Sequence, residues 1–104
     1  MAYKIFVTDN ARDSVHAILD YLSTSKKNPQ AAAAVLSDFR VTSSLLKTIA
    51  GSIRFCENPR LKEKDYKKIH FLRHKYFLVF HIIEENVFID FVFHDLQDYE
   101  SKIR

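Results

Sequence analysis

Residues 76–94 read YFLVFHIIEENVFIDFVFH, and this segment indicates a β-hairpin. Aromatic and β-branched residues fill two runs, Tyr76–Ile83 and Val87–His94, a composition typical of strands. Glu85-Asn86 separates the runs, and asparagine tolerates the left-handed conformation that a two-residue hairpin turn requires. A preceding run of the same kind, Tyr66–Leu72, adds a third strand. The sequence therefore predicts a three-stranded antiparallel meander in the C-terminal half.

The predicted turn fixes the pairing of this hairpin, because residue 84 then faces residue 87. His81 is expected opposite Asp90, Phe77 opposite His94, and Phe80 opposite Phe91. One face of the hairpin becomes wholly apolar and is expected to pack on helices. That face consists of Tyr76, Leu78, Phe80, Ile82, Val87, Ile89, Phe91 and Phe93.

The N-terminal half shows the periodicity of one strand followed by two helices. Residues 3–8 alternate with period two, and residues 10–23 carry an apolar stripe at helical spacing. Asn28 is the predicted N-cap of a second helix that runs from Pro29 to about Ile53. Its apolar seam follows steps of four and three residues: Val35, Phe39, Thr42, Leu46, Ile49 and Ile53. The helices are expected to form an antiparallel hairpin, and a coiled-coil oligomer is the alternative use of the seam.

The predicted fold class is therefore α+β, in a single domain over residues 1–104. An N-terminal strand and a helical hairpin precede the meander, which completes one sheet. Residues Leu96–Arg104 are expected to form a short helix or a tail.

Several classes of protein are excluded by simple features of the sequence. The single cysteine, Cys56, excludes an intramolecular disulfide and is expected to be a buried structural thiol. No cysteine and histidine cluster has zinc spacing, so neither a metal nor another cofactor is expected. The N-terminus does not read as a signal peptide, and no apolar run approaches the ~20 residues of a membrane span. A soluble cytoplasmic protein is expected.

Positive charge is concentrated between Arg54 and Lys75, where eight basic residues face three acidic ones. Such a segment can attract a phosphate backbone or an acidic protein, and the alternative is a solvated loop and strand edge. The candidate nucleic-acid or partner-binding residues are Arg54, Arg60, Lys62, Lys64, Lys67, Arg73 and Lys75.

The second face of the predicted sheet carries titratable side chains. With the expected register, Lys68, His70, His81, Asp90 and His94 gather on it, whereas Ile69 and Phe71 join the core. Histidine can move a proton near neutral pH, and lysine can stabilise phosphate charge. The candidate catalytic residues, for cleavage of RNA through its own 2′-hydroxyl, are therefore Lys68, His70, His81 and His94. The alternative is a partly exposed face with a stabilising His81–Asp90 cross-strand pair.

Six segments, in this order and spacing, resemble the RelE/ParE toxin superfamily. They are Tyr3-Lys4-Ile5, Asn28-Pro29-Gln30-Ala31-Ala32, Asn58-Pro59-Arg60-Leu61, Asp65-Tyr66-Lys67-Lys68-Ile69, Lys75-Tyr76-Phe77-Leu78-Val79-Phe80 and His94-Asp95-Leu96-Gln97-Asp98-Tyr99. The resemblance implies the toxin of a bacterial type II toxin–antitoxin pair, held in a hetero-oligomer by an antitoxin encoded beside it. RelE-like members cut mRNA in the ribosomal A site without a metal, whereas ParE-like members poison DNA gyrase.

The chain departs from the RelE pattern where RelE-like enzymes usually carry arginines. Phe77 stands at one such place, and Asp95-Leu96-Gln97 stands at the other. Lys68 matches a family lysine, and His70 sits where another basic residue is common. The long helical hairpin and the His94-x-x-x-Asp98 ending are closer to ParE. Three functions follow from the resemblance: an mRNA endonuclease, a gyrase inhibitor, or a catalytically degenerate member that acts only as a binding module.

Overall fold

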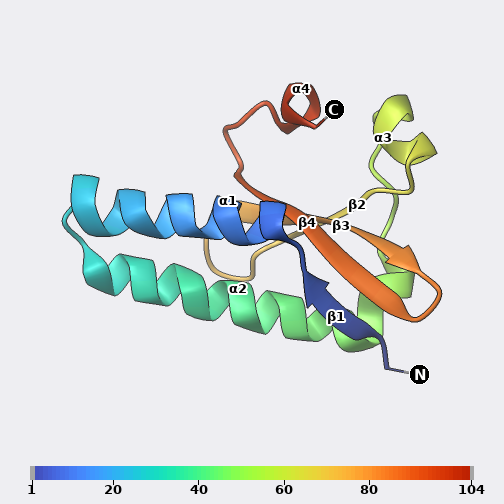
Figure 1. Ribbon diagram of the computed structural model, residues 1–104, viewed down its shortest axis with the longest axis horizontal. Coiled ribbons are helices and arrows are strands. Elements are labelled where there is room, and N and C mark those ends of the chain that lie inside the picture. The colour runs from blue at the N-terminus through green and yellow to red at the C-terminus, as the bar shows by residue number, and fades with distance from the viewer. Residues whose placement is uncertain (1, 104) are drawn as a thin grey trace.

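The computed structural model describes residues 2–103, which fold into a helical hairpin, a mixed sheet and two short helices (Figure 1). The elements are β1 (Lys4–Val7), α1 (Asp9–Asp20), a π-helical turn (Tyr21–Ser25), α2 (Pro29–Ile49), a 3₁₀ turn (Ala50–Ser52), α3 (Pro59–Glu63), β2 (Lys67–His70), β3 (Tyr76–Ile83), β4 (Asn86–His94) and α4 (Tyr99–Lys102). The strand order is β1-β4-β3-β2, with β1 parallel to β4 and the other neighbours antiparallel. The predicted α+β fold is confirmed.

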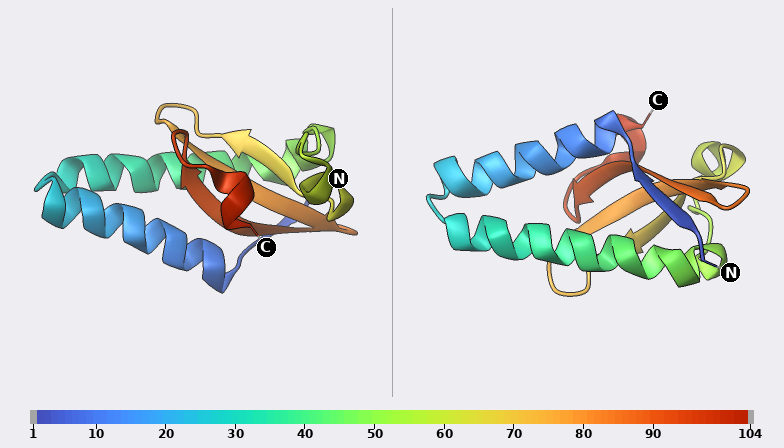
Figure 2. Two further views of the ribbon diagram at one scale, coloured as in Figure 1. Left: turned by 90° about the horizontal axis from the view of Figure 1, so that it is seen from above. Right: turned by 60° about the horizontal axis from the view of Figure 1, so that its bottom comes forward.

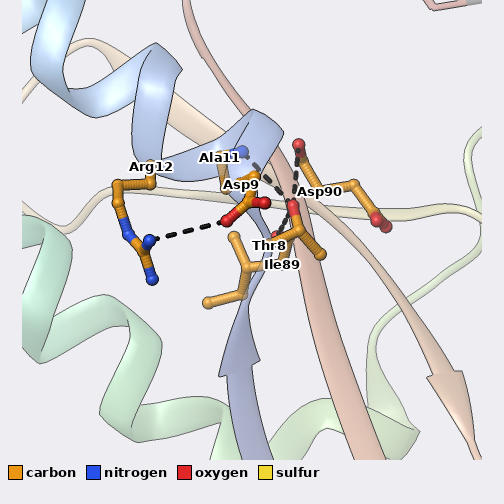
Figure 3. A network of polar contacts seen from close by, with 6 residues as sticks. All are labelled: Thr8, Asp9, Ala11, Arg12, Ile89 and Asp90. Atoms are coloured by element: carbon orange, nitrogen blue, oxygen red, sulfur yellow. Dashed lines mark hydrogen bonds and ion pairs between the residues drawn. The ribbon is translucent and has the colours of Figure 1, made fainter.

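Thr8 connects β1 to α1 and ties both to β4 (Figure 3). Its hydroxyl accepts a hydrogen bond from the Ala11 backbone N–H at 3.3 Å, which caps the helix. The same hydroxyl donates to the Ile89 carbonyl at 2.8 Å and lies 3.5 Å from the Asp90 carbonyl. The first turn of α1 is therefore anchored to the last long strand of the chain.

The second helix begins as predicted and ends slightly earlier. The Asn28 side chain accepts from the Ala31 N–H at 3.0 Å, and Pro29 occupies the first turn. The α-helix ends at Ile49 and tightens into a 3₁₀ turn. Tyr3 packs there: its N–H donates to the Lys47 carbonyl at 2.7 Å, and its hydroxyl lies where Gly51 has no side chain.

The helical hairpin covers one face of the sheet and forms the first core. Figure 2 shows α1 and α2 side by side and antiparallel, as predicted. The buried residues of this core are Ala11, Val15, Val35, Phe39, Leu46, Ala50, Phe71, Leu78, Phe80, Val87, Ile89 and Val92. None of the helices within residues 2–103 combines the length and apolarity needed to cross a lipid bilayer.

The predicted register of the β3–β4 hairpin is wrong. The turn consists of Glu84 and Glu85, with Glu84 at a φ of 57°, so Ile83 pairs with Asn86. His81 consequently faces Phe88 instead of Asp90, and Phe80 faces Ile89 instead of Phe91. The hairpin adopts this turn without glycine or asparagine at the left-handed position.

A β-bulge then changes which residues share a face. The register shifts between Val79 and Phe80, and Asp90 is left without a directly paired partner on β3. Beyond the bulge, Val79 pairs with Phe91 and Phe77 pairs with Phe93 instead of His94. Phe91 and Phe93, predicted for the helix-packed face, therefore lie on the opposite face, while Val92 joins the first core.

This opposite face supports a second core and is less exposed than predicted. Cys56, Leu61, Phe77, Val79, Phe93 and Ile103 form its buried centre. Leu61 comes from α3 and Ile103 follows α4, two segments that extend away from the helical hairpin in Figure 1. The short helix α3 was not predicted from the sequence; Asn58 caps it by accepting from the Arg60 N–H at 2.9 Å. Residues 96–103 bear out the expected short C-terminal helix, and Arg104 lies outside the described residues.

Candidate functional site

Lys68 lines a cavity on the face of the sheet that carries the second core. The cavity has a volume of about 320 Å³ and is lined by Arg54, Phe55, Cys56, Glu57, Lys68, Tyr99 and Glu100. The Lys68 Nζ lies 4.7 Å from the centre of the Tyr99 ring and 5.0 Å from that of the Phe77 ring. The ammonium group is thus held between two aromatic faces, which attract a cation electrostatically.

Tyr99 and Cys56 are hydrogen-bonded to one another in the wall of this cavity. Burial raises the pKa of Tyr99 to about 12, and nearby Cys56 and Glu100 add to the effect. Burial also raises the pKa of the Cys56 thiol, although Lys68 opposes that shift. Both groups are protonated at neutral pH, and Cys56 is buried as predicted. They can serve as hydrogen-bond partners, but neither is an activated nucleophile.

His70 lies on the same face of the sheet as Lys68, as the alternation of β2 predicted. These residues pair with Phe77 and Val79 of β3, whereas Ile69 and Phe71 contribute to the first core. The His70 ring is exposed, and its Nε2 lies 3.6 Å from Asp95 Oδ1.

Phe77, which the sequence resemblance aligns with a position where an arginine is usual, is a buried residue. It is 2% exposed and packs against Tyr99 and Phe93, with ring centres 5.0 and 5.8 Å away. Lys68 lies over it. The position is therefore used for packing, and phenylalanine offers no cation to a phosphate.

His81 and Asp90 form the predicted pair without being directly opposite one another. The His81 Nδ1 lies 2.5 Å from Asp90 Oδ2, a contact made across the bulge. Burial raises the pKa of Asp90, and the hydrogen bond from His81 counteracts part of that rise. The His81 ring also stacks on Phe88, with centres 5.2 Å apart, and meets the edge of Tyr66 at 6.1 Å.

His94 lies on the other face of the sheet, so its predicted grouping with Lys68, His70 and His81 is wrong. The bulge reverses the alternation, and His94 pairs with Tyr76, whose ring it meets edge-on at 5.1 Å. Both rings line a cavity with Ala17, Ile18 and Tyr21. The His94 Nδ1 accepts from the Leu96 N–H at 3.1 Å, which fixes the start of the C-terminal segment.

The basic segment does not form one continuous patch. Lys67 is buried on the helix side of the sheet, with its Nζ 3.4 Å from the Gly51 carbonyl and 4.6 Å from the centre of the Phe55 ring. Its predicted part in a binding surface is therefore wrong. Arg60 donates to the Glu100 carbonyl and so joins α3 to α4. The remaining candidates are exposed at two ends of the segment: Arg54, Lys62 and Lys64 before β2, and Arg73 and Lys75 after it.

Sequence reasoning missed a hydrogen bond between the buried Asp38 carboxylate and His74. The Asp38 carboxylate accepts from the His74 ring at 2.7 Å and from the Arg73 N–H at 3.0 Å. Burial by itself raises the pKa of Asp38, but the hydrogen bonds from His74 and Arg73 outweigh it and the pKa is lowered. The available signal was the place of Asp38 beside Phe39, three residues after the seam position Val35. Within residues 2–103, no three His, Cys, Asp or Glu side chains are grouped so that they could hold a metal ion.

Two solved toxin–antitoxin structures are similar to this fold. One is the chromosomal ParDE system from P. aeruginosa, with a TM-score of 0.71 and 17% sequence identity, covering 89% of this chain and 96% of that chain. The other is the RelBE2 toxin–antitoxin complex from Mycobacterium tuberculosis, with a TM-score of 0.57 and 18% identity, covering 90% of this chain and 99% of that one. No protein-family model and no curated protein sequence matches the chain. The chain therefore has the fold of ParE and RelE toxins at low sequence identity.

Proposed function

We propose that this chain is the toxin of a bacterial type II toxin–antitoxin pair and that it acts as a ParE-like inhibitor of DNA gyrase. The observation that carries the second part is Phe77, buried beneath Lys68 where RelE-like enzymes usually present an arginine. Phosphate cleavage depends on cations and hydrogen-bond donors aimed at the developing charge. A toxin that inhibits by binding needs no such arrangement.

The positions of the histidines support the same choice. A general acid or base must come within hydrogen-bonding distance of the group that it protonates or deprotonates. His94 lies on the other face of the sheet, and His81 is engaged with Asp90. His70 remains exposed beside Lys68, with Asp95 as its neighbour. Only two of the four candidate catalytic residues, Lys68 and His70, are therefore available together.

A ribosome-dependent mRNA endonuclease is the second candidate, and the cavity beside Lys68 favours it. Arg54 and Lys68 line this cavity together with the Tyr99 side chain. The two cations could stabilise the charge that develops on a phosphate during cleavage. The Tyr99 phenol, with a pKa of about 12, remains protonated and can donate a proton. On this reading Arg54 supplies the charge that Phe77 lacks.

The antitoxin is expected to be an acidic and partly disordered protein encoded beside the toxin. A sequence pI of about 9.0 gives the toxin a positive charge at neutral pH, and opposite charge accelerates association. Binding of such a protein would suppress growth arrest.

Inducible expression in a bacterial host, with DNA and protein synthesis pulse-labelled separately, tests the proposal. DNA synthesis should fall first, and purified toxin should block supercoiling by gyrase in vitro. An early fall in protein synthesis with mRNA cut inside codons would instead establish the endonuclease. If strong expression of the folded chain leaves growth unaffected, both proposals fail and a degenerate binding module is favoured.

A further inference from the structure

A cavity lies between α2 and the loop of residues 71–75 that joins β2 to β3, which Figure 2 shows beside this helix. Its volume is about 360 Å³, within the range of cavities that bind small molecules. It shares no lining residue with the cavity beside Lys68. The proposed function therefore makes no use of it.

The Asp38–His74 hydrogen bond forms part of the lining and holds the loop against the helix. Oδ2 of the Asp38 carboxylate, a side chain only 4% exposed, accepts from His74 Nδ1 at 2.7 Å and from the Arg73 N–H at 3.0 Å. Within residues 2–103, no hydrogen bond or ion pair engages the other ring nitrogen of His74, Nε2. The cavity is thus formed before any ligand arrives, which lowers the free-energy cost of binding.

The polar groups that remain available in the cavity are mainly donors. Arg73 is exposed, and none of the ion pairs within the described part of the chain involves its guanidinium group. That planar group matches a phosphate or a carboxylate with two parallel hydrogen bonds. Ser37, also exposed, adds a hydroxyl. Because the Asp38 carboxylate is buried and already hydrogen-bonded, an oxyanion suits the remaining groups better than a cation.

The rest of the lining is apolar. Ala34 and Val41 of α2 and Leu72 of the loop complete it, and the last two are exposed large hydrophobic residues. An apolar group that covers Val41 and Leu72 removes hydrophobic surface from water, which favours binding. The lining therefore fits an organic molecule with an oxyanion head better than it fits a bare inorganic ion.

We propose that this cavity binds a small organic oxyanion, a phosphate monoester or a carboxylate attached to an apolar group. Arg73 would bind the head group in bidentate fashion. Ser37 would donate a hydrogen bond to it, and so would His74 Nε2 when the ring is protonated, while Nδ1 keeps its bond to Asp38. The apolar group would lie against Val41 and Leu72. The site is independent of the proposed function and would be present whichever target the chain attacks.

The test uses the full chain, made by cell-free synthesis, and four probes: phenyl phosphate, benzoate, inorganic phosphate and benzylamine. Two-dimensional NMR should show saturable shifts at Ser37, Asp38, Arg73 and His74 with phenyl phosphate or benzoate, and the stronger of the two identifies the head group. Inorganic phosphate should bind at least about tenfold more weakly than phenyl phosphate, because it covers no apolar surface. Benzylamine, with the opposite charge, should not produce these shifts.

Matched variants locate the site. Arg73→Gln keeps the backbone N–H that donates to Asp38 but loses the guanidinium group, and it should weaken binding at least about tenfold. Arg73→Lys should restore only part of the affinity, because an ammonium group cannot bind in bidentate fashion. Lys75→Gln removes an exposed cation of the same loop that does not line the cavity, and it should have little effect. Equal losses in Arg73→Gln and Lys75→Gln, equal binding of benzylamine, or no saturable shift at these residues would overturn the proposal.

Discussion

Asp38 on α2 and His74 in the β2–β3 loop are joined by a hydrogen bond of 2.7 Å between Oδ2 and Nδ1. The carboxylate is 4% exposed and also accepts from the Arg73 N–H. These bonds fasten the loop to the helix at a point where no strand pairing holds it. Because the hydrogen bonds favour the ionised form more than burial disfavours it, the pKa of Asp38 lies below its ordinary value.

Replacing this carboxylate by an amide should destabilise the fold at neutral pH. Asp38→Asn is expected to lower the free energy of unfolding by about 1.5–3 kcal/mol at pH 7, the usual range for a hydrogen bond to a charged group. The stabilisation is present above the ordinary pKa of 3.8 and is lost as pH falls through the lowered folded value. Urea unfolding at several pH values should therefore show the two proteins converging in acid. Exposed Asp13→Asn is the control, and a pH-independent difference would contradict the assignment.

Asp90 should behave in the opposite way, because burial raises its pKa. The wild type should be most stable relative to Asp90→Asn below the ordinary pKa of 3.8, and that advantage should be lost as pH rises through the folded pKa. At pH 7 the two proteins should differ by less than about 1 kcal/mol, the range of a cross-strand pair. The same urea experiments measure this, and a large loss of stability confined to neutral pH would refute it.

Glu84 adopts a left-handed conformation that is unfavourable for a residue with a side chain. Glu84→Gly should raise the free energy of unfolding by about 0.5–1 kcal/mol, since glycine takes this conformation without steric cost. Glu85→Gly, with no positive φ to relieve, is the matched control and should be neutral or destabilising. Thermal or urea unfolding of the two variants distinguishes them, and an equal effect would show that the turn conformation is not responsible.

Ile103 closes the second core although it lies next to the chain end. It is 1% exposed and packs with Cys56 and Leu61. Ile103→Ala should lower the free energy of unfolding by about 2–4 kcal/mol and should accelerate reaction of Cys56 with a thiol reagent. Leu96→Ala, at a side chain 89% exposed, should change neither quantity measurably. A tail that does not pack would make the two variants indistinguishable.

Replacement of Lys68 and His70 should distinguish the two candidate functions. If the chain inhibits gyrase by binding elsewhere, Lys68→Ala with His70→Ala should still arrest growth and block supercoiling. An endonuclease should lose at least about a hundredfold in mRNA cleavage, the usual contribution of one proton-transfer or charge-stabilising group. Growth curves and cleavage mapping on the same strains provide the comparison, with circular dichroism to verify that the double variant folds.

Local signals in the sequence predicted most of the elements. Asn28 followed by Pro29 fixed the start of α2, and the two-residue period of β2 placed Lys68 and His70 on one face. The register of the hairpin could not be predicted, because the chain uses Glu84 where turn preferences point to glycine or asparagine. That error changed the pairing partners but not the face on which each residue lies, and the candidate site failed at the bulge instead. A bulge at Asp90 adds one residue without altering the apolar pattern, so nothing local shows that His94 changes face.

The burial of the second face depended on contacts distant in sequence. Residues 56–61 and 99–103 are too polar and too short for the sequence to predict that they cover this face of the sheet. In the structure, Leu61 and Ile103 complete the second core on that face. Phe77 illustrates the consequence. On a half-exposed sheet face, as the sequence predicted, Phe77 could simply have replaced a catalytic residue. In the structure its ring packs against Tyr99, so it serves as a packing residue.

The parallel pairing of β1 with β4 has a consequence for the order in which the protein can form. Thr8 and Ile89, which share a hydrogen bond, are 81 residues apart in the chain. During synthesis the first strand therefore has no partner until the last strand has left the ribosome, and closing so long a loop slows folding. The helical hairpin can form meanwhile from neighbouring residues. A nascent chain interrupted before residue 89 would carry both helices and an unpaired first strand, and it would lack the finished sheet.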